Sequence, residues 1–378
     1  MRQEDINKLN EPYTNSRVEI GRRFHSSIGA DIPSAGALVK EIFGDLDTQS
    51  FGIYWWASVN VEERILISDY LYQCAESIET NLVEAKLHYL EWLHARERHN
   101  ERIADVISRT PYGEIQGQMP PSKAPIDDLP NKLEGMHVCG FFRAIGSSLD
   151  CLGGAIINVL GLSSPLRWND IGAAGSALKK LTALGTQGSQ VQLDFRDFYE
   201  TVKKSSGPED WLEWTTQYRN MFVHRGRRII SNQLIPREVR LYDSAGQVIP
   251  RMTSTMHLAK YPDKSDMEAW IRKDVVLNED ADITLRGIFK SCRDFEESIC
   301  ERLVSIWLER RKTPSLIEQP SSQWNKEPKA CKFAGYKPEA EPLRADEIVC
   351  NPTLHHRMLA AAVDDAHRSL WANSKWNQ

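Results

Sequence analysis

One stretch of the sequence predicts the helix that carries the candidate site: Tyr218-Arg219-Asn220-Met221-Phe222-Val223-His224-Arg225-Gly226. It places a guanidinium, an amide and an imidazole within two turns of a predicted helix. Gly226 is typical of the residue that follows a helix. Upstream, Ser206-Gly207-Pro208-Glu209-Asp210 predicts a cap, a first-turn proline and acids near the positive helix end. We therefore expect a helix that begins near Pro208 and ends near His224.

Two faces of this helix can be read from its angular spacing, because an α-helix turns by about 100° per residue. The apolar stripe, which we expect to face the core, contains Trp211, Thr215, Tyr218 and Phe222. The opposite, polar stripe contains Glu213, Gln217, Asn220 and His224. Arg219 falls between the two stripes. This pattern predicts that His224 lies away from the core of its own subunit.

The polar residues of this helix suit the chemistry of RNA cleavage. A base must take the proton of a ribose 2′-hydroxyl, and an acid must protonate the leaving 5′-oxygen. His224 can titrate near neutral pH, and Arg219 can hold phosphate oxygens in a bidentate fork. A single imidazole cannot act as acid and base in one concerted step. Two copies of the motif, one from each subunit, would supply both groups.

The residues Arg219-Asn220-x3-His224 resemble the Arg-x4-His motif of the HEPN superfamily. The resemblance implies a dimeric, metal-independent endoribonuclease that leaves a 2′,3′-cyclic phosphate, in a toxin or anti-phage defence setting. It implies catalytic roles for Arg219, Asn220 and His224 and needs no cofactor. RNA, a second copy of the chain and an antitoxin or activating protein are the expected partners. Because the superfamily has noncatalytic members, a helical RNA-binding or protein-interaction module is the alternative.

Neighbouring residues extend this hypothetical site. Arg225, Arg227 and Arg228, with Lys203 and Lys204, predict a basic patch for RNA phosphates. On a second predicted helix, residues 133–162, a polar face stands inside an apolar segment; it contains Arg143, Ser147, Asp150 and Asn158. Asp150 is a candidate to orient His224 or Arg219. A structural ion pair between Arg143 and Asp150 is the other interpretation of this face.

The expected fold is mostly α: a HEPN-like helical bundle with a small β-hairpin insert and a Pro-rich C-terminal extension. We expect residues 1–60 to pack on the core, residues 61–312 to form the helical domain, and residues 313–378 to form a Pro-rich linker and a short helical tail. Residues 61–110 contain neither Gly nor Pro and predict one long helix or a helical pair. Further helices are predicted at residues 173–184, 192–204 and 283–311. Strands are predicted at 228–235, 238–242 and 247–252, with a turn at 243–246.

Composition narrows the class of protein. The 378 residues carry a net charge of −5, so any contact with nucleic acid must come from local basic patches. The sequence MRQEDINKLNEPY is unlike a signal peptide, and the seven cysteines form no CxxC pair, which favours the cytoplasm. The most apolar stretch, residues 141–162, contains Arg143, Asp150 and four glycines. It predicts a buried helix rather than a membrane span.

Metal chemistry is a competing interpretation of two ExxH pairs, Glu91-x-x-His94 and Glu134-x-x-His137. Di-iron bundles use two such pairs with two further glutamates. The first pair lies in a stretch dense with Arg and Glu, which favours a solvated face. The tail motifs His355-His356 and Asp364-Asp365-x-His367 are typical of a polar amphipathic helix. We therefore assign no metal site.

Overall fold

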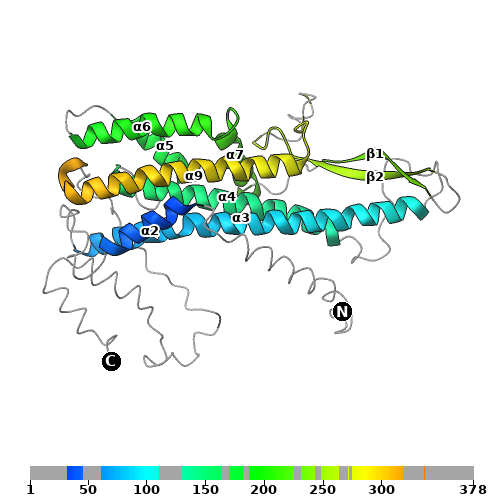
Figure 1. Ribbon diagram of the computed structural model, residues 1–378, viewed down its shortest axis with the longest axis horizontal. Coiled ribbons are helices and arrows are strands. Elements are labelled where there is room, and N and C mark those ends of the chain that lie inside the picture. Colours follow the sequence, from blue (N-terminus) through cyan, green and yellow to red (C-terminus); the bar gives the residue numbers. More distant parts are fainter. Residues whose placement is uncertain are drawn as a thin grey trace. The chain divides into compact units, whose positions relative to one another are not determined.

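The computed structural model describes residues 32–45, 61–109, 129–162, 170–181, 187–224, 231–242, 248–263, 271, 275–317 and 336. These residues are mostly helical (Figure 1). The helices are α2 (Pro33–Asp45), α3 (Val61–Arg109), α4 (Leu129–Val159), α5 (Ile171–Lys179), α6 (Gln187–Ser205), α7 (Trp211–His224) and α9 (Ala281–Lys312). The strands β1 (Ser231–Tyr242) and β2 (Val248–His257) and the short 3-10 helix η5 (Pro314–Leu316) complete the described elements.

The long helix α3 resolves the choice between one helix and a helical pair. It runs without a break through 49 residues, which corresponds to roughly 75 Å. No helix-breaking residue interrupts it, and its buried side chains, among them Leu71, Ile78, Leu82 and Trp92, recur at helical spacing. The absence of Gly and Pro from this part of the sequence is therefore explained by a single element.

The end of α4 is set by Gly161, because glycine is the residue type that most often follows a helix. Gly161 has a φ of 59°, a conformation that favours glycine. The Leu162 N–H donates to the Ile157 carbonyl oxygen at 2.9 Å, and the Gly161 N–H donates to that of Asn158 at 3.3 Å. These two bonds form a Schellman motif, which satisfies carbonyl groups left over at the helix end.

Two other helices differ in extent from their predicted ranges. Helix α5 begins two residues before Ala173, because the Asp170 side chain caps it by accepting a hydrogen bond from the Ala173 N–H at 2.6 Å. It ends at Lys179, five residues before the predicted end. Helix α6 begins at Gln187, five residues before the predicted start.

The strands β1 and β2 pair antiparallel, with Ser231 opposite His257 (Figure 1). The break predicted at Pro236 is absent, because β1 continues through this residue, which lies opposite Met252. Each strand of a two-stranded ribbon has a free edge, where a residue without an N–H is tolerated. The register instead shifts between Arg237 and Leu241. The predicted turn at 243–246 lies outside the described residues.

The chain divides into two compact units, each made of segments that are distant in sequence. Among the described residues, one unit contains those within 80–148 and 203–295, and the other contains those within 32–79, 149–202 and 296–336. The three longest helices, α3, α4 and α9, each contribute residues to both units. The predicted domain boundaries at residues 60 and 312 stay predictions.

In the second unit, two consecutive arginines hold α2 and α4 to α9. The Arg311 guanidinium contacts Asp45 at 2.7 Å and Glu41 at 2.8 Å, and the Trp307 indole N–H donates to Asp45 at 2.6 Å. Arg310 is fully buried and donates to the carbonyl oxygen of Val159 at 2.8 Å. This carbonyl belongs to the last turn of α4, where a cation is favoured. Burial lowers the pKa of Arg310 to about 9.

Helix α4 is long and apolar enough to cross a membrane, judged by length and composition alone. Its most apolar window is 72% buried against other parts of the protein, including the fully buried Phe141, Phe142 and Ile145. The core helix of a soluble protein has the same properties, so length and apolarity are weak grounds for a membrane span.

Candidate functional site

The candidate site lies on α7, whose start is set by the turn before it. Asp210 has a φ of 59°, and its carbonyl oxygen accepts a hydrogen bond from the Trp214 N–H at 2.9 Å. The Trp211 N–H donates to the Pro208 carbonyl oxygen at 3.2 Å. The prediction that Pro208 lies in the first helical turn is therefore wrong. The proline precedes the helix by three residues, because the chain makes a tight turn at Asp210 first.

The buried face of α7 packs on α4 through an aromatic cluster, which we define as Phe142, Trp214, Tyr218 and Phe222. The Phe142 and Tyr218 rings stack with centroids 4.4 Å apart and an interplanar angle of 24°. Trp214 and Phe222 contact the same Phe142 ring, at 5.8 and 6.0 Å between centroids. Rings at these separations attract one another beyond their burial. The cluster thus fixes how α7 is rotated on α4.

The segment that follows β2 is tied to this cluster by two hydrogen bonds. The Tyr218 hydroxyl accepts a bond from the Ala259 N–H at 3.0 Å, and the Trp214 indole N–H donates to the Lys260 carbonyl oxygen at 3.2 Å. Tyr218 is fully buried, and this burial raises the pKa of its hydroxyl group. The neutral hydroxyl therefore serves as a structural partner of the backbone.

The burial of side chains along α7 follows the two predicted faces. Trp211, Thr215, Tyr218 and Phe222 are buried. Glu213, Gln217 and His224 lie on the opposite side, where Glu213 and His224 are exposed, whereas Arg219 and Asn220 are half-buried. His224 is the last residue of the helix and lies one turn beyond Asn220. The structure thus places the imidazole at the surface, outside the core of its own subunit.

Arg219 lies against Gly146 of α4. A Cβ atom built on Gly146 would be only 2.5 Å from the Arg219 Cγ and 3.2 Å from its Cβ. The missing side chain of Gly146 therefore makes room for the stem of Arg219. At the other end of that side chain, the guanidinium Nη1 donates to the Asn220 Oδ1 at 2.9 Å. Sequence reasoning did not single out Gly146, since a glycine within an apolar helix has no single meaning.

Arg143, also on α4, reaches the C-terminal end of α7. Its guanidinium Nη2 donates to the Phe222 carbonyl oxygen at 3.2 Å. This carbonyl is in the last turn of α7, where carbonyl groups have no partner within the helix. A cation here complements the negative end of the helix dipole. The contact links α4 to α7 at Phe222, two residues before His224.

The remaining residues of the predicted polar face of α4 differ in burial. Ser147 and Asp150 are half-buried. Asn158 is buried and donates to the Gly154 carbonyl oxygen of its own helix at 2.7 Å. Asp150 belongs to the other unit from Arg219 and His224. The role of Asp150 in orienting either residue stays a prediction.

The predicted basic patch is only partly within the described residues. Arg225, Arg227 and Arg228 lie outside them. Lys203 forms an ion pair with Glu213 in the first turn of α7, and the Trp211 indole N–H donates to the Lys203 carbonyl oxygen. Glu213 precedes His224 by 11 residues, or roughly 16 Å along a helix. Lys203 therefore belongs to the opposite end of α7 from His224, and this part of the predicted patch is wrong.

The two ExxH pairs do not share a ligand set. Glu134 is fully buried and bonds to Arg96 at 3.0 Å. Its pKa is raised by burial, an effect that the Arg96 guanidinium partly offsets. The Nδ1 atom of His137 lies 3.1 Å from the Nδ1 atom of His88 instead. No group of three or more His, Cys, Asp or Glu side chains in the described ranges could hold a metal ion.

The two tail motifs lie outside the described residues. One contains His355 and His356, and the other contains Asp364, Asp365 and His367.

A scan of the chain against family models finds no match, and searches of curated proteins and of solved structures find none either. The function of this chain must therefore be inferred from its own residues.

Proposed function

We propose that the chain is a metal-independent endoribonuclease of the HEPN type, with a composite site formed by two copies. The observation that carries the proposal is the position of His224, exposed at the end of α7, with Arg219 and Asn220 on the adjoining edge of the same helix. The HEPN-like bundle, with β1 and β2 as an insert, is part of this proposal. So is the setting in the cytoplasm as a toxin or anti-phage effector.

Each residue has a role that its chemistry supports. Arg219 holds the scissile phosphate and stabilises the charge that develops on its oxygens. His224 transfers a proton to or from the reacting oxygens. Asn220, bonded to the Arg219 guanidinium at 2.9 Å, holds that guanidinium in place and presents its own amide N–H groups to the phosphate.

The need for a second copy follows from the single imidazole. One His224 serves as the base, and the His224 of the other subunit serves as the acid. The surface beside the imidazole suits such an interface, because Val223 is 46% exposed and adds an apolar side chain there. The polar edge of α7 would then be covered by its symmetry-related copy.

The test is cleavage of a fluorescently labelled RNA by the purified full-length protein in EDTA. We expect products that end in a 2′,3′-cyclic phosphate, and no cleavage of a DNA of the same sequence, which lacks the attacking hydroxyl. Arg219→Ala and His224→Ala should each remove at least about 99% of the activity. Glu213→Ala, an exposed change on the polar stripe of the same helix, is the matched control and should keep it.

Two outcomes would count against this function. Cleavage that depends on an added divalent metal would contradict the metal-independent mechanism. RNA that stays intact but binds the wild-type protein would favour the alternative, a noncatalytic RNA-binding module. In that case Arg219→Ala should weaken binding, since the guanidinium would still contact phosphate.

A further inference from the structure

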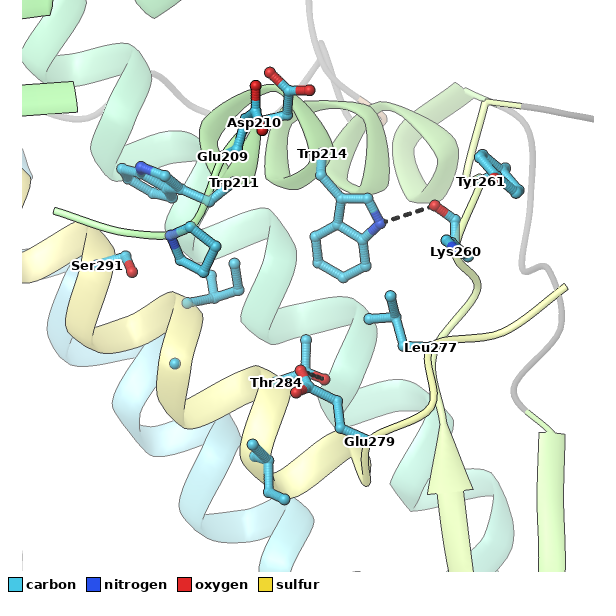
Figure 2. A pocket seen from close by; sticks show the side chains of 14 residues that line it. Glu209, Asp210, Trp211, Trp214, Lys260, Tyr261, Leu277, Glu279, Thr284 and Ser291 are labelled. Carbon is cyan, nitrogen blue, oxygen red and sulfur yellow. Dashed lines mark hydrogen bonds between the residues drawn. The ribbon is translucent and has the colours of Figure 1, made fainter. Parts of the chain in front are cut away.

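A cavity of about 590 Å³ lies at the N-terminal end of α7 (Figure 2), whereas His224 is the last residue of this helix. All of its lining residues belong to one unit, between residues 203 and 295. They come from the turn before α7 and its first residues, from the segment after β2 that contains Lys260, from the segment before α9 that contains Leu277, and from one face of α9. Its size is in the range of pockets that take small molecules.

Aromatic and aliphatic side chains form the walls of this cavity. The indole of Trp214 stands between α7 and α9, held by its N–H bond to the Lys260 carbonyl oxygen (Figure 2). It also contacts the Tyr218 ring, with ring centroids 4.7 Å apart. Ile283 of α9 is 52% exposed and adds an apolar surface to the lining. The indole is therefore a preformed flat wall for a ligand.

The described residues that line the cavity carry three carboxylates and one ammonium group. Glu279 is held by the Thr284 hydroxyl, which donates to its Oε1 at 2.8 Å, and both side chains lie below the Trp214 ring in Figure 2. Glu209 and Asp210 add two exposed carboxylates at the start of α7. Lys260 is the cation among the lining residues, and its ammonium lies over the Tyr261 ring, 5.8 Å from the centroid. Such a surface attracts cations and repels anions.

Gly287 leaves the backbone of α9 uncovered at one position of the cavity lining. Gly287 lies in the interior of this helix, and a Cβ atom built on it would meet nothing within 4 Å. Neighbouring protein atoms therefore give no reason for a residue without a side chain here. A glycine in the middle of a helix costs stability, and it allows a ligand to approach the backbone closely.

We propose that this cavity binds a small organic cation with a flat apolar body, such as an arylamidine or an arylalkylamine. The body would stack on the indole of Trp214, whose π face also attracts the positive charge. The cationic end would bond to the carboxylate of Glu279, which the Thr284 hydroxyl already orients. The site does not depend on the proposed ribonuclease activity, and neither assignment falls with the other.

Isothermal titration calorimetry with three molecules of nearly the same shape tests the proposal. Benzamidine is a cation, benzamide is its neutral counterpart and benzoate is an anion. We expect a Kd on the order of 1 mM for benzamidine, which is reasonable for so small a ligand. Benzamide should bind at least about fivefold more weakly, and benzoate should show no binding. Equal or tighter binding of benzamide or benzoate, or no binding of benzamidine, would overturn the proposal.

Two variants show whether binding occurs in this cavity. Glu279→Gln keeps the acceptor for Thr284 and removes the charge, so it should weaken benzamidine about tenfold and leave benzamide unchanged. Gly287→Leu fills the cavity and should abolish binding. Its matched control is Gly36→Leu, because Gly36 is an exposed glycine of α2 whose added Cβ would also meet nothing within 4 Å. If circular dichroism shows that the Gly287→Leu protein is folded and it still binds benzamidine as the wild type does, the cavity is not the site.

A last comparison distinguishes a free small molecule from a basic side chain of another protein. A short peptide with a central arginine and otherwise neutral residues is titrated under the same conditions. We expect it to bind no more tightly than benzamidine. Binding at least about tenfold tighter, or about 1.4 kcal/mol, would assign the cavity to a protein partner and overturn its assignment to a small ligand.

Discussion

The stem of Arg219 occupies the space that a side chain on Gly146 would need. A Cβ built on Gly146 would lie 2.5 Å from the Arg219 Cγ, so a side chain at position 146 would force Arg219 to move. Gly287 is the opposite case, a helical glycine whose added Cβ would meet open space. The same substitution at the two positions therefore separates steric fit from the general effect of glycine on a helix.

Gly146→Ala should displace Arg219 and reduce kcat/KM for RNA cleavage about 10- to 100-fold, as expected for a misplaced catalytic group. The added methyl should also lower the free energy of unfolding by about 1–3 kcal/mol. Gly287→Ala should instead raise that free energy by about 0.5–1 kcal/mol and leave cleavage unchanged. Urea denaturation and cleavage kinetics measure both. A Gly146→Ala protein with wild-type kinetics would remove the constraint on Arg219.

Mixed dimers test whether the two His224 side chains act in one site. Wild-type and His224→Ala subunits are mixed, allowed to exchange, and assayed at several ratios. If both imidazoles are needed together, activity falls with the square of the wild-type fraction, so an equal mixture keeps about a quarter. A linear decrease, with about half of the activity in the equal mixture, would indicate independent sites.

Tyr218→Phe should remove the hydroxyl that accepts a bond from the Ala259 N–H. The buried N–H would lose its partner, at a cost of about 1–3 kcal/mol in the free energy of unfolding. Hydrogen exchange at Ala259 should become faster at the same time. Because Phe keeps the ring that stacks on Phe142, cleavage of RNA should change little. Unchanged exchange at Ala259 would contradict this role of the hydroxyl.

The pair His88 and His137 should make stability depend on pH. Burial lowers the pKa of both imidazoles from 6.5, and the charge of His88 lowers that of His137 further, against the opposing effect of Glu91. Glu84, 3.8 Å from the His88 Nε2, also opposes the shift of His88. An imidazole whose pKa is lowered by folding contributes stability that is present above pH 6.5. This stability is lost as the pH falls through the lower pKa of the folded state.

The measurement is the urea midpoint of the wild type and of His137→Gln between about pH 8 and about pH 5. The wild type should lose more stability than the variant over the acidic part of this range, because the variant has one fewer imidazole to protonate. Parallel curves for the two proteins would show that the pair does not contribute.

The sequence predicted best the features that depend on short-range periodicity. The two faces of α7 follow from the spacing of Trp211, Tyr218 and Phe222, and the end of α4 follows from Gly161. The helix boundaries were predicted less accurately, because a cap such as Asp170 or a tight turn at Asp210 acts through a backbone conformation that residue type alone does not fix. The single strand through Pro236 was missed because an unpaired edge tolerates proline.

Features that depend on tertiary contact could not be read from the sequence. The approach of Arg219 to Gly146 joins two helices that are far apart in the chain, and the cavity joins the start of α7 to α9. Lys203 was expected beside His224 because it is close in sequence to α7, but its partner is Glu213 at the other end. Proximity along the chain was a poor guide there, since a helix separates its two ends in space.

Trp214 belongs both to the aromatic cluster that seats α7 and to the wall of the cavity. Variation at this position therefore cannot adjust one of these surfaces while the other stays the same. A lineage that altered the cavity for a different ligand by replacing Trp214 would also alter the support beneath Arg219 and His224. Changes in ligand preference should instead accumulate at Ile283, Gly287 and Glu279, which lie outside that cluster.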